Sequence, residues 1–103
     1  MSYKIQRTDK ANDQLHEIIQ YIAADSGSVE IALNYLEKIE RAITLLKDQP
    51  NMGSIPRYLA LKRQGYRVLI VERHLVFYKV DDEAHMITLH AVIDGRREYR
   101  NLI

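Results

Sequence analysis

The spacing of hydrophobic residues changes about halfway along the chain, and the first half follows the spacing of α-helices. Apolar side chains there recur every three or four residues, which places them along one side of a helix. The two stripes are Ala11, Leu15, Ile18, Ile19 and Ile22, then Ala32, Leu36, Ile39, Ile43 and Leu46. Thr8 or Asp9 can cap the first helix, and the second begins near Ser28 or Val29. The short Asp25–Ser28 link predicts an antiparallel helical hairpin.

After Pro56 the apolar and polar residues alternate, which is the spacing of β-strands. The strands that we expect are Tyr66–Val71, Leu75–Val80 and Met86–Ile93. The segments between them, Glu72–His74 and Asp81–His85, are short and polar, so the strands should form an antiparallel meander. An earlier alternating stretch, "SYKIQR" at residues 2–7, predicts a strand before the first helix.

The predicted element order is β-α-α-β-β-β, which indicates an α+β fold of two layers, with the helical hairpin packed on an antiparallel sheet. We expect one domain over residues 1–103. In the last strand the uniformly apolar set should face the helices: Ile87, Leu89, Ala91 and Ile93. Thr88 and His90 should then point to the other face, which would be open to solvent or to a partner.

Composition excludes several classes of protein. The chain has no cysteine, so it has no disulfide and no thiolate metal site, and its four histidines show no metal-binding spacing. We expect neither a metal nor another cofactor. No apolar run approaches the length of a membrane span, and no signal peptide is visible, so we expect a cytoplasmic protein without membrane contact.

The net charge of +1 is unevenly distributed. Residues 1–56 carry six Lys or Arg against eight Asp or Glu, whereas residues 57–103 carry nine against six. This excess of cations in the second half indicates an anionic partner, although it is smaller than in dedicated nucleic-acid-binding proteins.

Two basic groups should meet at one edge of the sheet. Arg73 and His74 fall in the first hairpin turn, and "DGRREYR" at Asp94–Arg100 follows the last strand, whose end lies beside that turn in a meander. The cations and the aromatic residue of the second group suit a phosphate or carboxylate partner: Arg96, Arg97, Tyr99 and Arg100. Arg67 should lie at the opposite end of its strand.

Each group also has a simpler interpretation. Arg73 and His74 can be an ordinary polar turn, and the arginines after the last strand can form salt bridges with Asp94 and Glu98. His90 can be a partly buried, hydrogen-bonded side chain of the sheet.

The chain resembles the RelE/ParE superfamily of toxins from type II toxin–antitoxin systems. The resemblance rests on four features: Ala32 and Tyr35 in the second helix, the segment at the end of this helix with Leu46, Pro50 and Gly53, the strand "HLVFYKV", and the Gly-Arg-Arg after the last strand. It implies a cytoplasmic, growth-arresting toxin of a plasmid-stabilisation or stress module. A cognate antitoxin would neutralise this toxin.

The superfamily has two branches with different targets. ParE-like members poison DNA gyrase, whereas RelE-like members cut messenger RNA in the ribosome. In the RelE pattern, the arginine of the middle strand falls on His74, and the two lysines fall on Arg67 and Leu69. The catalytic arginine falls on Arg97, whereas the tyrosine falls near Ile103 rather than on Tyr99. This incomplete match and the long first helix favour the ParE-like branch and a gyrase inhibitor.

An endoribonuclease is the alternative. Cleavage by the 2′-hydroxyl needs a base, an acid and cations at the phosphate. The residues that could supply them are His74, His90, Glu98 and Tyr99 for acid–base chemistry, and Arg67, Arg73, Arg96 and Arg97 for the phosphate. A third interpretation is a degenerate member that binds its antitoxin without being toxic.

Overall fold

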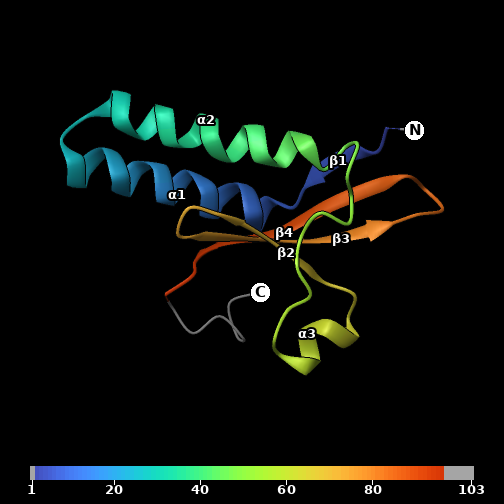
Figure 1. The fold of residues 1–103 in the computed structure, drawn as a ribbon. Helices are drawn as coiled ribbons and strands as arrows, with labels where there is room; N and C mark the ends of the chain where they lie inside the picture. The colour runs from blue at the N-terminus through green and yellow to red at the C-terminus, as the bar shows by residue number, and fades with distance from the viewer. Residues whose placement is uncertain (1, 97–103) are drawn as a thin grey trace.

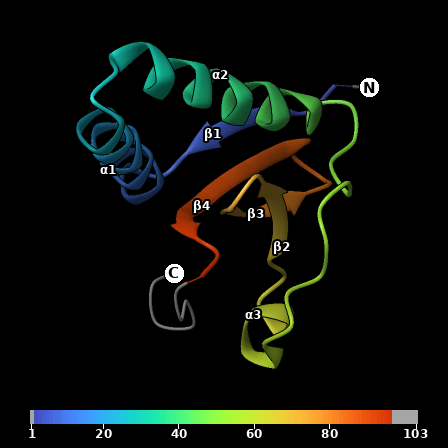
Figure 2. The ribbon, with the colours of Figure 1, turned by 60° about the vertical axis from the view of Figure 1, so that its left-hand side comes forward.

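The computed structural model describes residues 2–96 and confirms the predicted α+β fold. Helices α1 and α2 lie side by side across one face of the sheet (Figure 1), so the molecule has a helical layer and a sheet layer (Figure 2). The elements are β1 (Lys4–Arg7), α1 (Asp9–Ser26), α2 (Val29–Leu45), α3 (Leu59–Arg63), β2 (Arg67–Val71), β3 (His74–Asp81) and β4 (Met86–Asp94).

The strands form a four-stranded sheet in the order β1-β4-β3-β2. Strands β2, β3 and β4 form the predicted antiparallel meander. Strand β1 pairs in parallel with β4, with Ile5 beside Ile87, a neighbour that the sequence did not indicate. The two edge strands of the sheet are therefore β1 and β2, and the sheet is antiparallel as predicted except where β1 pairs with β4.

The helix ends follow from local hydrogen bonds. The Thr8 hydroxyl accepts a bond from the Ala11 N–H at 3.1 Å, and Ser28 does the same for α2. Gly27 ends α1 with a φ of 70°, a conformation in which a residue without Cβ is not strained. Neither these helices nor any other in residues 2–96 has the length and apolar character needed to cross a membrane.

The main core lies between the helical hairpin and the sheet. Ile39 and Leu46 are fully buried there, as predicted from their place in the stripe of α2. Its other buried members come from both layers: Ala11, Leu15, Ile43, Leu69, Val71, Val76, Tyr78, Ile87, Leu89 and Val92. Burial of this apolar surface is the main stabilising contribution to the fold.

A β-bulge changes which residues of β4 face the helices. Phe77 pairs with Ala91, but the next residue of β3 pairs with Leu89, so His90 is an extra residue in the ladder. A one-residue shift turns the following side chains to the opposite face. Ile87 and Leu89 therefore face the helices as predicted, whereas the prediction for Ala91 and Ile93 is wrong. Both belong to a second cluster on the other face, and Val92 joins the main core instead.

The face of the sheet away from the hairpin is partly covered by α3, a short helix that the sequence analysis missed. Figure 2 shows α3 on the side opposite to α1 and α2. A second apolar cluster lies beneath it, formed by Leu61, Tyr66, Val68, Phe77, Ala91 and Ile93. The expectation that this whole face is open was therefore wrong. The part of this face that α3 does not cover includes the exposed side chain of Ile70.

Candidate target-binding site

The turn between β2 and β3 contains two residues rather than the predicted three. Val71 pairs with His74, which leaves Glu72 and Arg73 to make the turn, and Glu72 has a positive φ of 55°. The placement of His74 in the turn was wrong. His74 is the first residue of β3, and only 4% of its surface is exposed. Arg73 is therefore the exposed cation of this turn.

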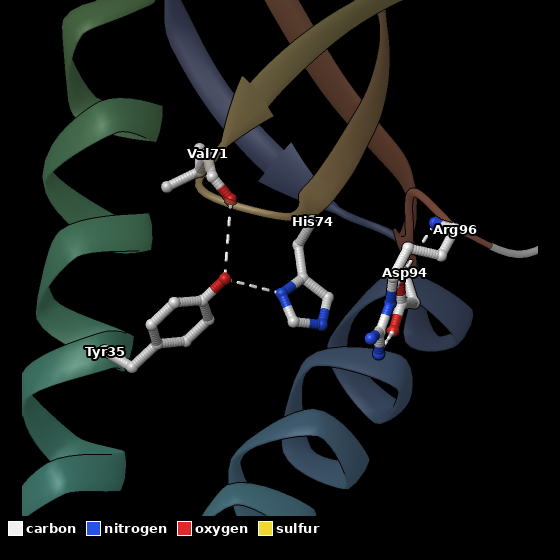
Figure 3. A network of polar contacts seen from close by, with 5 residues as sticks. All are labelled: Tyr35, Val71, His74, Asp94 and Arg96. Atoms are coloured by element: carbon white, nitrogen blue, oxygen red, sulfur yellow. Dashed lines mark hydrogen bonds and ion pairs between the residues drawn. The ribbon is translucent and has the colours of Figure 1, made fainter.

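A hydroxyl group from α2 holds His74 and the turn together (Figure 3). The Tyr35 oxygen lies 2.6 Å from Nδ1 of His74 and 3.4 Å from the carbonyl oxygen of Val71. Both contacts are satisfied when the Nδ1–H of His74 donates to the Tyr35 oxygen and the Tyr35 hydroxyl donates to Val71. Burial lowers the pKa of His74 and raises the pKa of Tyr35, so both groups favour their neutral forms.

The chain after β4 begins beside this turn, as the sequence predicted. Asp94 pairs with His74 across the sheet, and the Gly95 N–H donates to the Arg73 carbonyl oxygen at 2.8 Å. We call Arg73 and Arg96 the basic edge. The remaining candidates of the segment lie outside the described residues: Arg97, Glu98, Tyr99 and Arg100.

The charge of Arg96 is partly balanced by its neighbour. Its guanidinium contacts both carboxylate oxygens of Asp94, at 2.9 and 3.2 Å, and this holds the pKa of the Asp94 carboxyl well below its usual range. The simpler interpretation, a salt bridge to Asp94, is therefore confirmed for Arg96. Within residues 2–96 no carboxylate lies within ion-pair distance of Arg73, whereas Glu72 lies 3.5 Å from Lys38 of α2.

Arg67 lies at the opposite end of β2, as predicted, and its side chain has a structural role. The guanidinium donates to the carbonyl oxygens of Gly53 and Asn51 at 2.8 and 3.3 Å. The hydroxyl of Tyr78, its partner in the ladder, accepts a bond from the Gly53 N–H and donates to the Pro50 carbonyl. The Pro50–Gly53 part of the recognised motif thus holds the loop after α2 against the sheet.

His90 lies on the face opposite to His74. Its ring stands edge-on to Tyr66 of the second cluster, with 5.4 Å between centroids, and the Lys79 ammonium lies over the same tyrosine ring. Burial and the Lys79 charge lower the pKa of His90. A hollow of about 490 Å³ beside it is lined by Lys79, Val80, Asp81, Asp82, Glu83, Thr88 and His90.

A cavity of about 430 Å³ lies between α1 and the end of β4, and nothing in the sequence indicated it. Its lining mixes apolar and polar side chains: Gln14, Glu17, Ile18, Tyr21, Ile22, His74, Val92, Ile93 and Asp94. The second ring nitrogen of His74 points toward the side of Asp94 (Figure 3). In the described part of the chain no three His, Cys, Asp or Glu side chains are grouped to hold a metal ion.

Two solved structures share this fold. One is described as the chromosomal ParDE TA system from P. aeruginosa, with a TM-score of 0.73 and 18% identity, covering 90% of this chain and 96% of that chain. The other is the toxin–antitoxin complex RelBE2 from Mycobacterium tuberculosis, with a TM-score of 0.62 and 20% identity, covering 91% and 99%. At these identities the similarity shows the fold, which is that of chains found in toxin–antitoxin systems.

The sequence itself identifies the family. The family model described as "ParE toxin of type II toxin-antitoxin system, parDE" matches residues 5–99, nearly the whole chain. The chain therefore belongs to the ParE toxin family, and the resemblance to the RelE/ParE superfamily is confirmed. No curated protein gives a significant sequence match.

Proposed function

We propose that this toxin arrests growth by binding DNA gyrase through its basic edge, that it does so without cutting RNA, and that a cognate antitoxin neutralises it. The antitoxin follows from the family and from the two complexes that share the fold. The choice of gyrase over messenger RNA rests on the arrangement of the ionisable side chains.

The observation that carries the proposal is the separation of the two histidines. His74 faces the helices, bonded to Tyr35, whereas His90 lies on the far face beside Tyr66. An acid and a base must both reach one scissile phosphate. Two histidines on opposite faces of a sheet cannot do so, so they do not form an acid–base pair.

The phosphate-binding positions of the RelE pattern are also unsuited to RNA. Arg67 is engaged by two backbone carbonyl groups, and Leu69 is an apolar side chain buried in the main core. The hollow beside His90 is lined by Asp81, Asp82 and Glu83, whose charges would repel a phosphate backbone. These features support an inhibitor that binds its target over one that cuts it.

Two assays of the purified toxin test the target. We expect wild type to block DNA supercoiling by purified gyrase and to leave messages intact on translating ribosomes. The Arg73→Gln/Arg96→Gln double variant should lose inhibition at least about tenfold, because arginines that contact a partner contribute strongly to affinity. Surface substitutions usually lower the free energy of unfolding by about 0.5 kcal/mol or less, so the variant should stay folded. Co-purification with the antitoxin verifies this.

The matched control removes the same charge elsewhere. Lys4→Gln/Lys10→Gln changes two exposed lysines of β1 and α1, and we expect it to inhibit gyrase like wild type. Cleavage of messages on translating ribosomes, with supercoiling unaffected, would contradict the proposal and favour the endoribonuclease. In that case His90, with its lowered pKa, becomes the candidate base. A wild type that neither arrests growth nor affects either target would identify a degenerate member.

A further inference from the structure

Ile70 is exposed in the middle of a strand whose other apolar residues are buried. Its side chain is 62% exposed, whereas Val68, two residues earlier on the same face, is 6% exposed beneath α3. An isolated exposed isoleucine is common on protein surfaces and needs no explanation by itself. The surroundings of Ile70 distinguish it from such a residue.

The exposed side chain continues an apolar row that begins in the second cluster. Ile70 pairs with Leu75 on β3, and Leu75 pairs with Ile93 on β4. Ile93 is buried, Leu75 is partly buried against the cluster, and Ile70 reaches the surface. Ile70 is thus the exposed end of an apolar row, and Leu75, its neighbour in the ladder, supports it.

This apolar row ends at the basic edge. Arg73 follows Ile70 by three residues, in a turn fixed by the Tyr35 contacts and by the bond from Gly95 to the Arg73 carbonyl. The side chains most important in protein interfaces are well packed apolar groups and arginines, surrounded by a polar rim. A phosphate backbone, in contrast, offers no surface that an isoleucine would bind.

We propose that Ile70, supported by Leu75, is the apolar anchor with which the basic edge binds a protein target. The matching surface on that target is an apolar pocket bordered by a carboxylate that complements Arg73, because the charge of Arg96 is already partly balanced by Asp94. This inference rests on the proposed function, in which the target is a protein. It adds a contact residue that has no charge and no place in the family motifs.

The test compares two exposed apolar residues. Ile70→Ser removes the anchor, and Leu45→Ser removes an apolar side chain of similar exposure, 54%, from the end of α2. We expect Ile70→Ser to weaken gyrase inhibition at least about tenfold, as the loss of an interface anchor does. Leu45→Ser should inhibit like wild type. Ile70→Val, which keeps an apolar β-branched side chain, should retain most of the inhibition.

Growth arrest at equal toxin levels separates this inference from the proposed function. One outcome is that wild type fails to inhibit gyrase while Ile70→Ser, but not Leu45→Ser, loses growth arrest. In that outcome Ile70 is the anchor and the protein target is not gyrase. An Ile70→Ser toxin that arrests growth like wild type overturns the inference, whatever the target. The inference is also overturned if Ile70→Ser and Leu45→Ser lose growth arrest equally. The same holds if the wild-type toxin cleaves messages and Ile70→Ser cleaves them equally well.

Discussion

Tyr35→Phe removes one hydroxyl group and tests whether α2 holds the β2–β3 turn. The phenyl ring of the variant can keep the place of the half-buried tyrosine ring. Nδ1 of His74 loses its partner, however, and His74 is almost fully buried, whereas the carbonyl of Val71 loses one contact of 3.4 Å. The substitution therefore leaves a buried polar nitrogen unsatisfied rather than opening a cavity.

The size of the effect follows from this unsatisfied nitrogen. Leaving a buried donor or acceptor without its partner costs about 1–3 kcal/mol. In a domain of about 100 residues each kcal/mol lowers the melting temperature by about 4–8 °C. We expect the melting temperature of Tyr35→Phe to fall by at least about 4 °C.

Thermal unfolding followed by circular dichroism measures this change, with Tyr21→Phe as the control. Tyr21 is 62% exposed on α1, so the loss of its hydroxyl should have little effect on stability. The reasoning would be refuted if Tyr35→Phe melted at the temperature of Tyr21→Phe. The turn would then be fixed by its own ladder bonds, without help from α2.

Two further predictions concern stability. Gly53→Ala places a Cβ 2.7 Å from the Tyr78 hydroxyl oxygen, and overpacking of this kind costs about 1–3 kcal/mol. The melting temperature of Gly53→Ala should fall, while that of Ser54→Ala should not. Equal melting temperatures for the two variants would contradict the close approach of residue 53 to Tyr78. The second concerns pH. Burial holds the pKa of folded His74 below 6.5, so below that pH the unfolded chain takes up a proton that the folded protein does not, and stability falls as the pH is lowered. Denaturant unfolding between about pH 7.5 and 5 should show a smaller loss in His74→Asn than in wild type or His16→Asn. If His74→Asn lost as much stability at low pH as wild type does, His74 would be excluded as a source of the pH dependence.

The helical half of the fold was predictable because its signals are local. The stripes of α1 and α2 repeat over several turns, and Thr8, Gly27 and Ser28 act within a few residues of their own positions. Helix α3 has only five residues, too few for a period to be recognised. The bulge at His90 is equally invisible, because one extra residue in a strand leaves the alternation of apolar and polar letters nearly unchanged.

The candidate site was predictable where it depends on strand order. A meander brings the end of its third strand to the first turn, and Arg73 and Gly95 do meet there. The burial of His74 was not predictable, since it depends on a hydroxyl 39 residues earlier in the chain. Ile70 was missed for a different reason, because an apolar residue in an alternating strand is normally assigned to the core.

The pairing of β1 with β4 has a consequence for the order in which the molecule is made. Partners such as Gln6 and Thr88 are 82 residues apart, so the first strand leaves the ribosome long before its neighbour exists. Closing so long a loop is slow, and the main core also lacks Ile87 and Leu89 until β4 has emerged. Gly95, which anchors the Arg73 turn, comes later still. A nascent or truncated chain that lacks β4 and Gly95 therefore has no assembled basic edge, and under the proposed function it cannot yet bind its target.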